Sequence, residues 1–109
     1  MNTPDFEVGL SVRARRDLRE IGRYSADAAS EAVAQKNCDR LIAAMESLAT
    51  QPERYPPEPL LAKFGNYRVM RVRKLPYEIF YKVSDNAVVV VRIIHAKRDL
   101  KRIFRRFKP

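Results

Sequence analysis

His95 and Arg98 are the residues whose types and spacing most readily suggest chemistry. His95 is the only histidine of the chain, and the arginine follows it by three positions in the segment IHAKRDLKRIF. An imidazole can exchange a proton near neutral pH, and a guanidinium can hold a phosphate through paired hydrogen bonds. However, His95 also ends an apolar run typical of a buried strand, where a ring hydrogen-bonded to a backbone carbonyl would fix the following turn. We favour this structural interpretation over a catalytic or target-contacting one.

The segment after Arg98 combines an apolar stripe with closely spaced cations. The stripe has the spacing of one helical face and consists of Leu100, Ile103, Phe104 and Phe107. The cations that lie off this stripe are Lys101, Arg102, Arg105, Arg106 and Lys108. The sequence therefore predicts a short basic C-terminal helix, with Asp99 in its first turn as a structural acid. We expect the helix to dock through its apolar stripe and to contact a target through Arg98, Lys101, Arg102, Arg105 and Arg106.

The net charge of +9 is concentrated in the second half of the chain. Residues 1–62 carry 8 basic and 10 acidic side chains, residues 63–82 carry 6 and 1, and residues 97–109 carry 7 and 1. Such an asymmetry indicates a polyanionic partner, which could be nucleic acid, a nucleoprotein machine or an acidic peptide. The alternative is a solvated face that only aids solubility.

Length and composition exclude several classes of protein. A chain of 109 residues is near the usual size of one domain, so we expect a single domain over residues 1–109. No apolar run is long enough to span a membrane, and the N-terminus MNTPDFEVGL does not read as a leader, which predicts a cytoplasmic protein. Cys38 is the only cysteine and follows the apolar spacing of a helix, so we expect a small core residue. We expect no disulfide, metal or other cofactor.

Two consecutive helices are predicted in the first half of the chain. A weakly alternating segment at residues 6–12 should form a short strand. Residues 13–30 then carry the helical stripe Ala14, Leu18, Ile21, Ser25 and Ala28, and residues 31–51 carry the stripe Ala34, Cys38, Leu41, Met45 and Leu48. A break near residues 27–30 should let the helices fold back as an antiparallel hairpin. The proline-rich segment PERYPPEP ends the second helix and should be a rigid connector.

The second half predicts three strands in a meander, at about residues 66–73, 77–83 and 87–95. The last strand has apolar residues at both parities, as expected in the middle of a sheet. The fold class is therefore α+β, with the hairpin packed on one face of a mostly antiparallel sheet and the other face available to a partner. In the first of these strands, Arg71 and Arg73 have the parity opposite to Met70 and Val72, which predicts one packed side and one cationic side.

Four segments carry a resemblance to a known family. DLREIGRY, RLIAAMESLATQPERYP, YRVMRVRKLPYEIFYKV and VVVVRIIHAKRDLKRIF resemble, in this order, the RelE/ParE superfamily of bacterial toxins from type II toxin–antitoxin modules. The resemblance covers about residues 7–107 and is greatest to the ParE branch. It implies a small toxin that a cognate antitoxin holds inactive through a partly disordered segment. RelE-like toxins cut messenger RNA on the ribosome, whereas ParE-like toxins act on DNA gyrase.

The positions that RelE-type ribonucleases use are only partly retained. Matched through PYEIFY, the two basic strand positions are Val69 and Arg71, and the arginine of the next strand is replaced by Glu78. A carboxylate would repel a phosphate rather than stabilise its transition state. Arg98 is retained, but the tyrosine that assists proton transfer corresponds to Phe104, which has no proton to donate. The ribonuclease activity would then depend on Arg71, Arg98 and His95, with Arg68 and Arg73 adding charge.

We therefore expect a toxin that binds DNA gyrase or a gyrase–DNA complex and has no bond-breaking chemistry of its own. The alternative is a ribosome-dependent endoribonuclease with ribosome and messenger RNA as partners, and a further one is a module that has lost toxicity or binds another polyanion. We expect an acidic antitoxin segment to bind between the hairpin and the sheet and to meet Arg68, Arg71 and Arg73, which we expect to lie outside the core. No membrane partner is expected.

Overall fold

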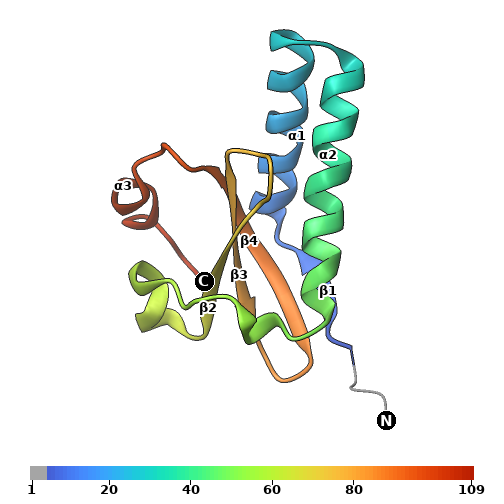
Figure 1. The fold of residues 1–109 in the computed structure, drawn as a ribbon. Helices are drawn as coiled ribbons and strands as arrows, with labels where there is room; N and C mark the ends of the chain where they lie inside the picture. The colour runs from blue at the N-terminus through green and yellow to red at the C-terminus, as the bar shows by residue number, and fades with distance from the viewer. Residues whose placement is uncertain (1–4) are drawn as a thin grey trace.

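In residues 5–109, which the computed structural model describes, four strands form one sheet in the order β1-β4-β3-β2 (Figure 1). Part of the N-terminus that was predicted to carry no leader, residues 1–4, lies outside the described residues. The strands are β1 (Glu7–Leu10), β2 (Tyr67–Arg71), β3 (Tyr77–Val83) and β4 (Ala87–His95). The α-helices are α1 (Val12–Ala28), α2 (Glu31–Glu46) and α3 (Leu100–Phe104). Short 3-10 helices lie at Ser47–Ala49, Pro52–Arg54 and Pro59–Phe64. The predicted α+β class is confirmed.

The helices α1 and α2 form the predicted hairpin, which extends beyond the sheet (Figure 1). Ser11 and Ser30 cap their N-termini, because each hydroxyl accepts a backbone N–H three residues later, at 3.0 and 3.1 Å. Gly22 lets the two helices approach closely, since a Cβ there would lie only 3.3 Å from the Sγ of Cys38. Cys38 is thus a half-buried residue at the helix contact, although the helical spacing predicted a core residue.

The sheet is mostly antiparallel, as predicted, and β4 lies inside it. β4 pairs antiparallel with β3 and parallel with β1, and β2 pairs antiparallel with β3. The strands β3 and β4 have the predicted bounds, whereas β2 ends at Arg71. It ends there because the chain turns, with the N–H of Leu75 donating to the carbonyl of Val72 and Lys74 in the left-handed region. Arg73 therefore lies in the turn between β2 and β3 and not in a strand.

Both faces of the sheet are covered. The face toward the helical pair, here called the hairpin face, packs Ala14, Ile21, Leu41, Met45, Met70, Ile79, Tyr81, Val83, Val88, Val90 and Ile93 into one core. The opposite face, here called the α3 face, carries a second apolar cluster of Leu61, Tyr67, Phe80, Ile94 and Phe104. The expectation that this second face stays open is wrong. Its apolar side chains are buried away from water by α3 and by the 3-10 helix Pro59–Phe64, which pack on this face.

The C-terminal helix docks as predicted but is shorter than its apolar stripe. Asp99 caps it, accepting the backbone N–H of Arg102 at 3.2 Å. Phe104 is buried and meets Phe80 edge to face, with ring centroids 4.9 Å apart. Phe107 lies beyond the helical residues, yet its ring still contacts Phe64 at 5.3 Å and Tyr67 at 5.4 Å. The apolar stripe is therefore used completely, although α3 itself ends at Phe104.

Within residues 5–109, none of the helices is long and apolar enough to cross a membrane.

Candidate functional site

The positions corresponding to the ribonuclease residues fall largely within the apolar cluster of the α3 face. Val69 packs against this cluster, and Phe104 belongs to it. Glu78 lies on the same face, directly opposite Arg71 in the register, and their side chains pair at 3.5 Å. The Arg71 side chain is 88% exposed, whereas that of Glu78 is only 12% exposed. A phosphate that approached Arg71 would therefore also meet a carboxylate.

The residues named for a ribonuclease do not all lie together. Arg71 shares the α3 face with Glu78, because directly paired residues project from the same side of a sheet. His95 pairs with Tyr77, whose ring packs against the core of the hairpin face. His95 and Arg71 therefore project from opposite faces of the sheet, while Arg98 follows His95 at the end of β4.

His95 fixes the turn after β4, but not through a bond to a carbonyl as expected. Its Nδ1 accepts the backbone N–H of Lys97 at 3.1 Å, and its ring meets that of Tyr77 edge to face at 5.5 Å between centroids. The backbone carbonyl of His95 accepts the N–H of Arg98 at 3.0 Å. Because Nδ1 is an acceptor, the neutral ring carries its proton on Nε2 and can donate from there.

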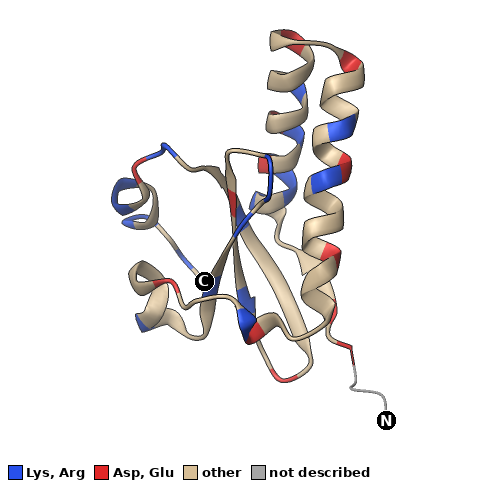
Figure 2. Cartoon of the chain, in the orientation of Figure 1, with Lys and Arg blue, Asp and Glu red and all other residues tan. Residues whose placement is uncertain are grey.

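The basic residues of the C-terminal segment are exposed and free of ion pairs within the described part of the chain. Figure 2 shows Lys and Arg in blue over α3 and the residues that flank it. The set comprises Arg98, Lys101, Arg102, Arg105 and Arg106, which are all exposed and make no salt bridge within residues 5–109. The docked apolar stripe thus leaves its cations to the solvent, as the sequence predicts.

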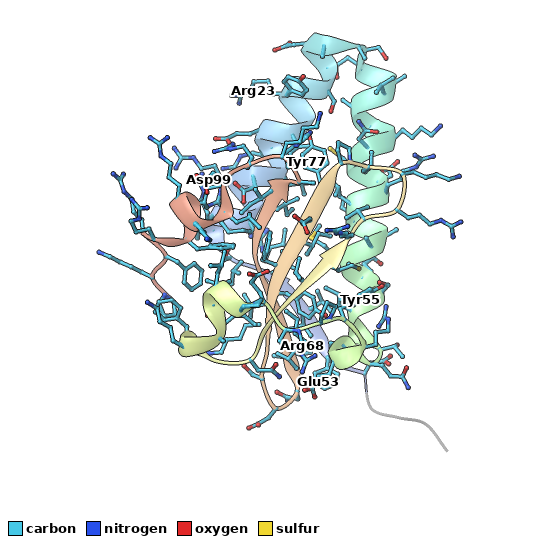
Figure 3. All side chains as sticks on the ribbon, turned by 60° about the vertical axis from the view of Figure 1, so that its left-hand side comes forward. Arg23, Glu53, Tyr55, Arg68, Tyr77 and Asp99 are labelled. Atoms are coloured by element: carbon cyan, nitrogen blue, oxygen red, sulfur yellow. The ribbon has the colours of Figure 1, made fainter. Side chains whose placement is uncertain are left out.

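Arg68 is not outside the core, contrary to the expectation for β2. Its guanidinium donates to the backbone carbonyls of Glu53 at 3.0 Å and Tyr55 at 2.7 Å, and its side chain is 16% exposed. Figure 3 shows these three residues together. Arg68 has the parity of Met70, and that side of β2 is packed, so the arginine holds the proline-rich connector to the sheet. Its contact with an antitoxin stays a prediction.

A shallow groove of about 460 Å³ lies between α2 and the turn after β2, and we call it the α2–β2 groove. Its lining consists of Arg40, Ala43, Ala44, Val72, Arg73 and Lys74. Small apolar side chains form its floor, and three cations surround them. The sequence pattern points to Arg73 but not to Arg40, because an arginine on an exposed helix has no distinguishing pattern. Only the meeting of α2 with the turn places the three cations together.

A buried ion pair between α1 and β4 was also missed. Arg92 donates from Nε to Asp17 at 2.8 Å, and the same carboxylate accepts the backbone N–H of Ile93 at 3.0 Å. β1 ends opposite Val90, so Asp17 takes over the edge of β4 that β1 no longer covers. Two signals pointed to the pair: an arginine inside the apolar run VVVVRIIH and an aspartate beside the apolar stripe of α1.

Next to this ion pair is a second groove of about 330 Å³, which we call the α1–β4 groove. It is lined by Arg13, Asp17, Glu20, Ile21, Tyr24, Tyr77, Arg92, Ile93, Ile94, His95 and Arg98. It therefore brings together both residues with which the sequence analysis began, His95 and Arg98. Among residues 5–109, no three histidine, cysteine, aspartate or glutamate side chains are grouped so as to hold a metal ion.

Comparisons with known proteins found a family model and solved structures that match this chain. The model of the family described as ParE toxin of type II toxin-antitoxin system, parDE, matches residues 8–106. The fold is similar to the chromosomal ParDE TA system from P. aeruginosa, with a TM-score of 0.73 and 14% identity over 85% of this chain and 98% of that chain. It is also similar to the toxin–antitoxin complex RelBE2 from Mycobacterium tuberculosis, with a TM-score of 0.59 and 19% identity over 86% and 94%. A search of curated proteins found no match.

Proposed function

The chain belongs to the ParE toxin family of type II toxin–antitoxin systems, and from this premise we propose that it inhibits DNA gyrase by binding. The toxin would bind gyrase or the gyrase–DNA complex and break no bond itself. A cognate antitoxin would hold it inactive until the antitoxin is removed. The basic α3 segment supplies the attraction to the target, because exposed cations next to DNA release condensed counterions.

The observation that carries this proposal is the chemistry of the α3 face. Ribonuclease activity of the RelE type needs cationic groups around the scissile phosphate and a side chain that moves a proton. Here Val69 and Phe104 pack in the apolar cluster, and Glu78 pairs with Arg71 at 3.5 Å. The ring of Phe104 has no proton to give. A binding mechanism needs none of these groups, whereas cleavage needs all of them.

The α2–β2 groove is our proposed antitoxin contact. Arg73, Lys74 and Arg40 surround an apolar floor of Ala43, Ala44 and Val72, which suits an acidic segment with small apolar side chains. Arg71 projects from the α3 face and is not part of this groove, so its contact with an antitoxin stays a separate prediction. Charge pairing of this kind speeds association more than it sets affinity. The association rate with the antitoxin should therefore fall as ionic strength rises, and a rate independent of salt would contradict the contact.

Two assays run in parallel test the proposed function. Supercoiling by purified gyrase is measured with increasing toxin, and translation in a cell extract is followed by primer extension on the message. We expect gyrase to be inhibited and the message to stay intact, and a stoichiometric addition of antitoxin should reverse the inhibition. Cleaved message together with unaffected gyrase would replace this proposal by the ribosome-dependent endoribonuclease.

A double variant examines the α3 face directly. Glu78→Arg with Phe104→Tyr restores two side chains that the ribonucleases use, but Val69 remains in the apolar cluster. We expect no cleavage in the translation extract, because a catalytic site needs its groups placed within about 0.5 Å. The Glu78 side chain is only 12% exposed, so the variant must first be shown to be folded. Cleavage by the folded variant would mean that the α3 face needs fewer cations than we propose.

A further inference from the structure

Apart from Arg98, which belongs to the basic α3 segment, the lining of the α1–β4 groove is explained by neither gyrase binding nor the antitoxin contact. Arg13, Asp17, Glu20 and Tyr24 follow one another along one face of α1 and form one wall. The other wall is the end of β4 with Tyr77, His95 and Arg98. In Figure 3, the label of Tyr77 lies below that of Arg23 of α1 and to the right of that of Asp99, which precedes α3. The groove is thus built from three segments that are distant in the sequence.

One end of this groove is suited to an anion. Arg98 is exposed and makes no ion pair within residues 5–109, so its guanidinium is available for a bidentate contact. His95 adds a donor at Nε2, because its Nδ1 already accepts the N–H of Lys97. Arg92, by contrast, forms an ion pair with Asp17 at 2.8 Å, so it stabilises the fold and is not available to a ligand.

The wall formed by α1 carries an exposed aromatic ring. Tyr24 is 68% exposed, an unusual degree for a large ring that lines a groove. An exposed ring beside cations is the arrangement with which proteins bind single-stranded nucleic acid, since any base can stack on it while the cations hold the backbone. The volume of about 330 Å³ lies at the lower end of the range for small-molecule sites. It suits one nucleotide rather than a longer ligand.

The carboxylates of the groove decide between a nucleotide and an acidic peptide. Asp17 is engaged by Arg92, by Arg13 and by the backbone of Ile93. Glu20 is exposed, and among residues 5–109 it pairs only with Arg16, at 3.6 Å. An acidic side chain would be repelled by Glu20. A base has exocyclic amino groups that can donate to a carboxylate, as cytosine does, so the same residue favours a nucleotide.

We infer that the α1–β4 groove binds single-stranded DNA, with the phosphate on Arg98 and His95, a base on Tyr24 and an amino group of the base on Glu20. The inference rests on the proposed function, since a toxin that acts on gyrase and its DNA meets strands that have been opened. A duplex presents its bases stacked and paired, so its bases cannot reach the tyrosine. The groove therefore distinguishes single strands from duplexes.

Fluorescence anisotropy with the full-length toxin tests this, using a labelled single strand of about 12 nucleotides and no gyrase. We expect Tyr24→Ala to weaken binding about tenfold, because stacking on one aromatic side chain is worth about 1–3 kcal/mol. Tyr24→Phe keeps the ring and should bind as the parent does. Arg98→Ala should also weaken binding and reduce its salt dependence. Lys36 is an exposed cation on α2 outside the groove, so Lys36→Ala should lower the affinity only slightly and leave the salt dependence nearly unchanged.

Three outcomes would overturn the inference. They are equal affinity for duplex and single strand, displacement of the labelled strand by polyglutamate as efficiently as by unlabelled strand, and unchanged affinity in Tyr24→Ala. Tyr24 is exposed, so circular dichroism should show all variants folded, and a loss in Tyr24→Ala cannot be ascribed to unfolding. The supercoiling assay separates the two proposals. If the toxin inhibits gyrase but does not bind the oligonucleotide, DNA binding by the groove is rejected and the proposed function stands. If it binds the oligonucleotide but does not inhibit gyrase, the groove binds DNA and the proposed function is rejected.

Discussion

The edge of β4 beside α1 holds a buried ion pair, whereas the α3 face of the sheet is packed with aliphatic and aromatic side chains. At that edge, Asp17 and Arg92 are nearly enclosed, with side chains 5% and 16% exposed, and the carboxylate also accepts a backbone N–H of β4. On the α3 face, Phe80, Ile94 and Phe104 pack where a nuclease would need cations. In this protein, the buried ion pair holds backbone segments together, and the charged side chains that are available to partners lie outside both apolar cores. The following predictions test that division, from the largest expected effect on folding to the smallest.

The largest effect is expected from Asp17→Ala. The change leaves Arg92 buried without its partner and the N–H of Ile93 without an acceptor, and removing one member of a buried pair costs about 4 kcal/mol. That is a large part of the stability of a small protein, so urea denaturation should show a much lower midpoint. Glu20→Ala removes an exposed pair on the same helix and should cost less than about 1 kcal/mol. Equal losses of unfolding free energy in both variants would show that the buried pair contributes no more to stability than the exposed pair.

Truncation of the α3 face should cost somewhat less. Phe104→Ala removes a buried ring that contacts Phe80, and we expect a loss of about 3 kcal/mol. The value is at the low end for phenylalanine because α3 is short and near the surface, so it can relax into part of the cavity. Ile103→Ala, at a half-buried position in the same helix, is the matched control and should cost less. A loss as large as that of Asp17→Ala would show that the α3 face and the edge of β4 beside α1 are equally critical for folding.

A pH titration tests the packing of the hairpin face by another route. Burial raises the pKa of Tyr81 on the hairpin face to about 12, an effect that nearby Arg68 and Arg54 partly oppose, and its hydroxyl donates to the carbonyl of Pro52. Above about pH 10 the unfolded chain loses this proton while the folded chain keeps it. The stabilisation is therefore complete below pH 10 and is lost as pH rises toward 12, by about 2 kcal/mol. Thermal unfolding of Tyr81→Phe should depend less on pH over this range, and an unchanged slope would contradict the assignment.

The periodicity of the sequence was enough to predict the hairpin, the bounds of β3 and β4 and the docking of α3. It was not enough for contacts that join distant segments. Arg68 was assigned to the surface, although the connector at Glu53 and Tyr55 closes over it. A strand pattern shows which residues share a side, but not which loop covers that side. The cover over the α3 face was missed for the same reason, because residues 59–64 carry no regular period.

The candidate site divides in the same way. His95, Arg98 and the cations of α3 could be found in the sequence because they are consecutive or follow a helical spacing. The grooves could not, because each joins segments more than 25 residues apart: Arg40 lines one groove with Arg73 and Lys74, and Tyr24 lines the other with His95. Asp17 and Arg92 lie 75 residues apart, and only their unusual positions among apolar neighbours marked them. Unusual polarity in an apolar segment is thus the signal that local periodicity cannot supply.

The smallest effect on folding, and a large one on function, is expected when four cations of the C-terminal segment are replaced by alanine: Lys101, Arg102, Arg105 and Arg106. All four are exposed, and like charges in solvent contribute little to folding, so the melting temperature should stay nearly unchanged. Toxicity should nevertheless fall at equal soluble expression, because these side chains attract the target. The matched control replaces four exposed cations of the hairpin, Arg15, Arg19, Arg23 and Lys36, and alters the net charge equally. If the control loses as much toxicity, only net charge matters and α3 is not a contact surface. If the first variant stays fully toxic, the basic segment only aids solubility, and the division between buried charge for the fold and exposed charge for partners fails at α3.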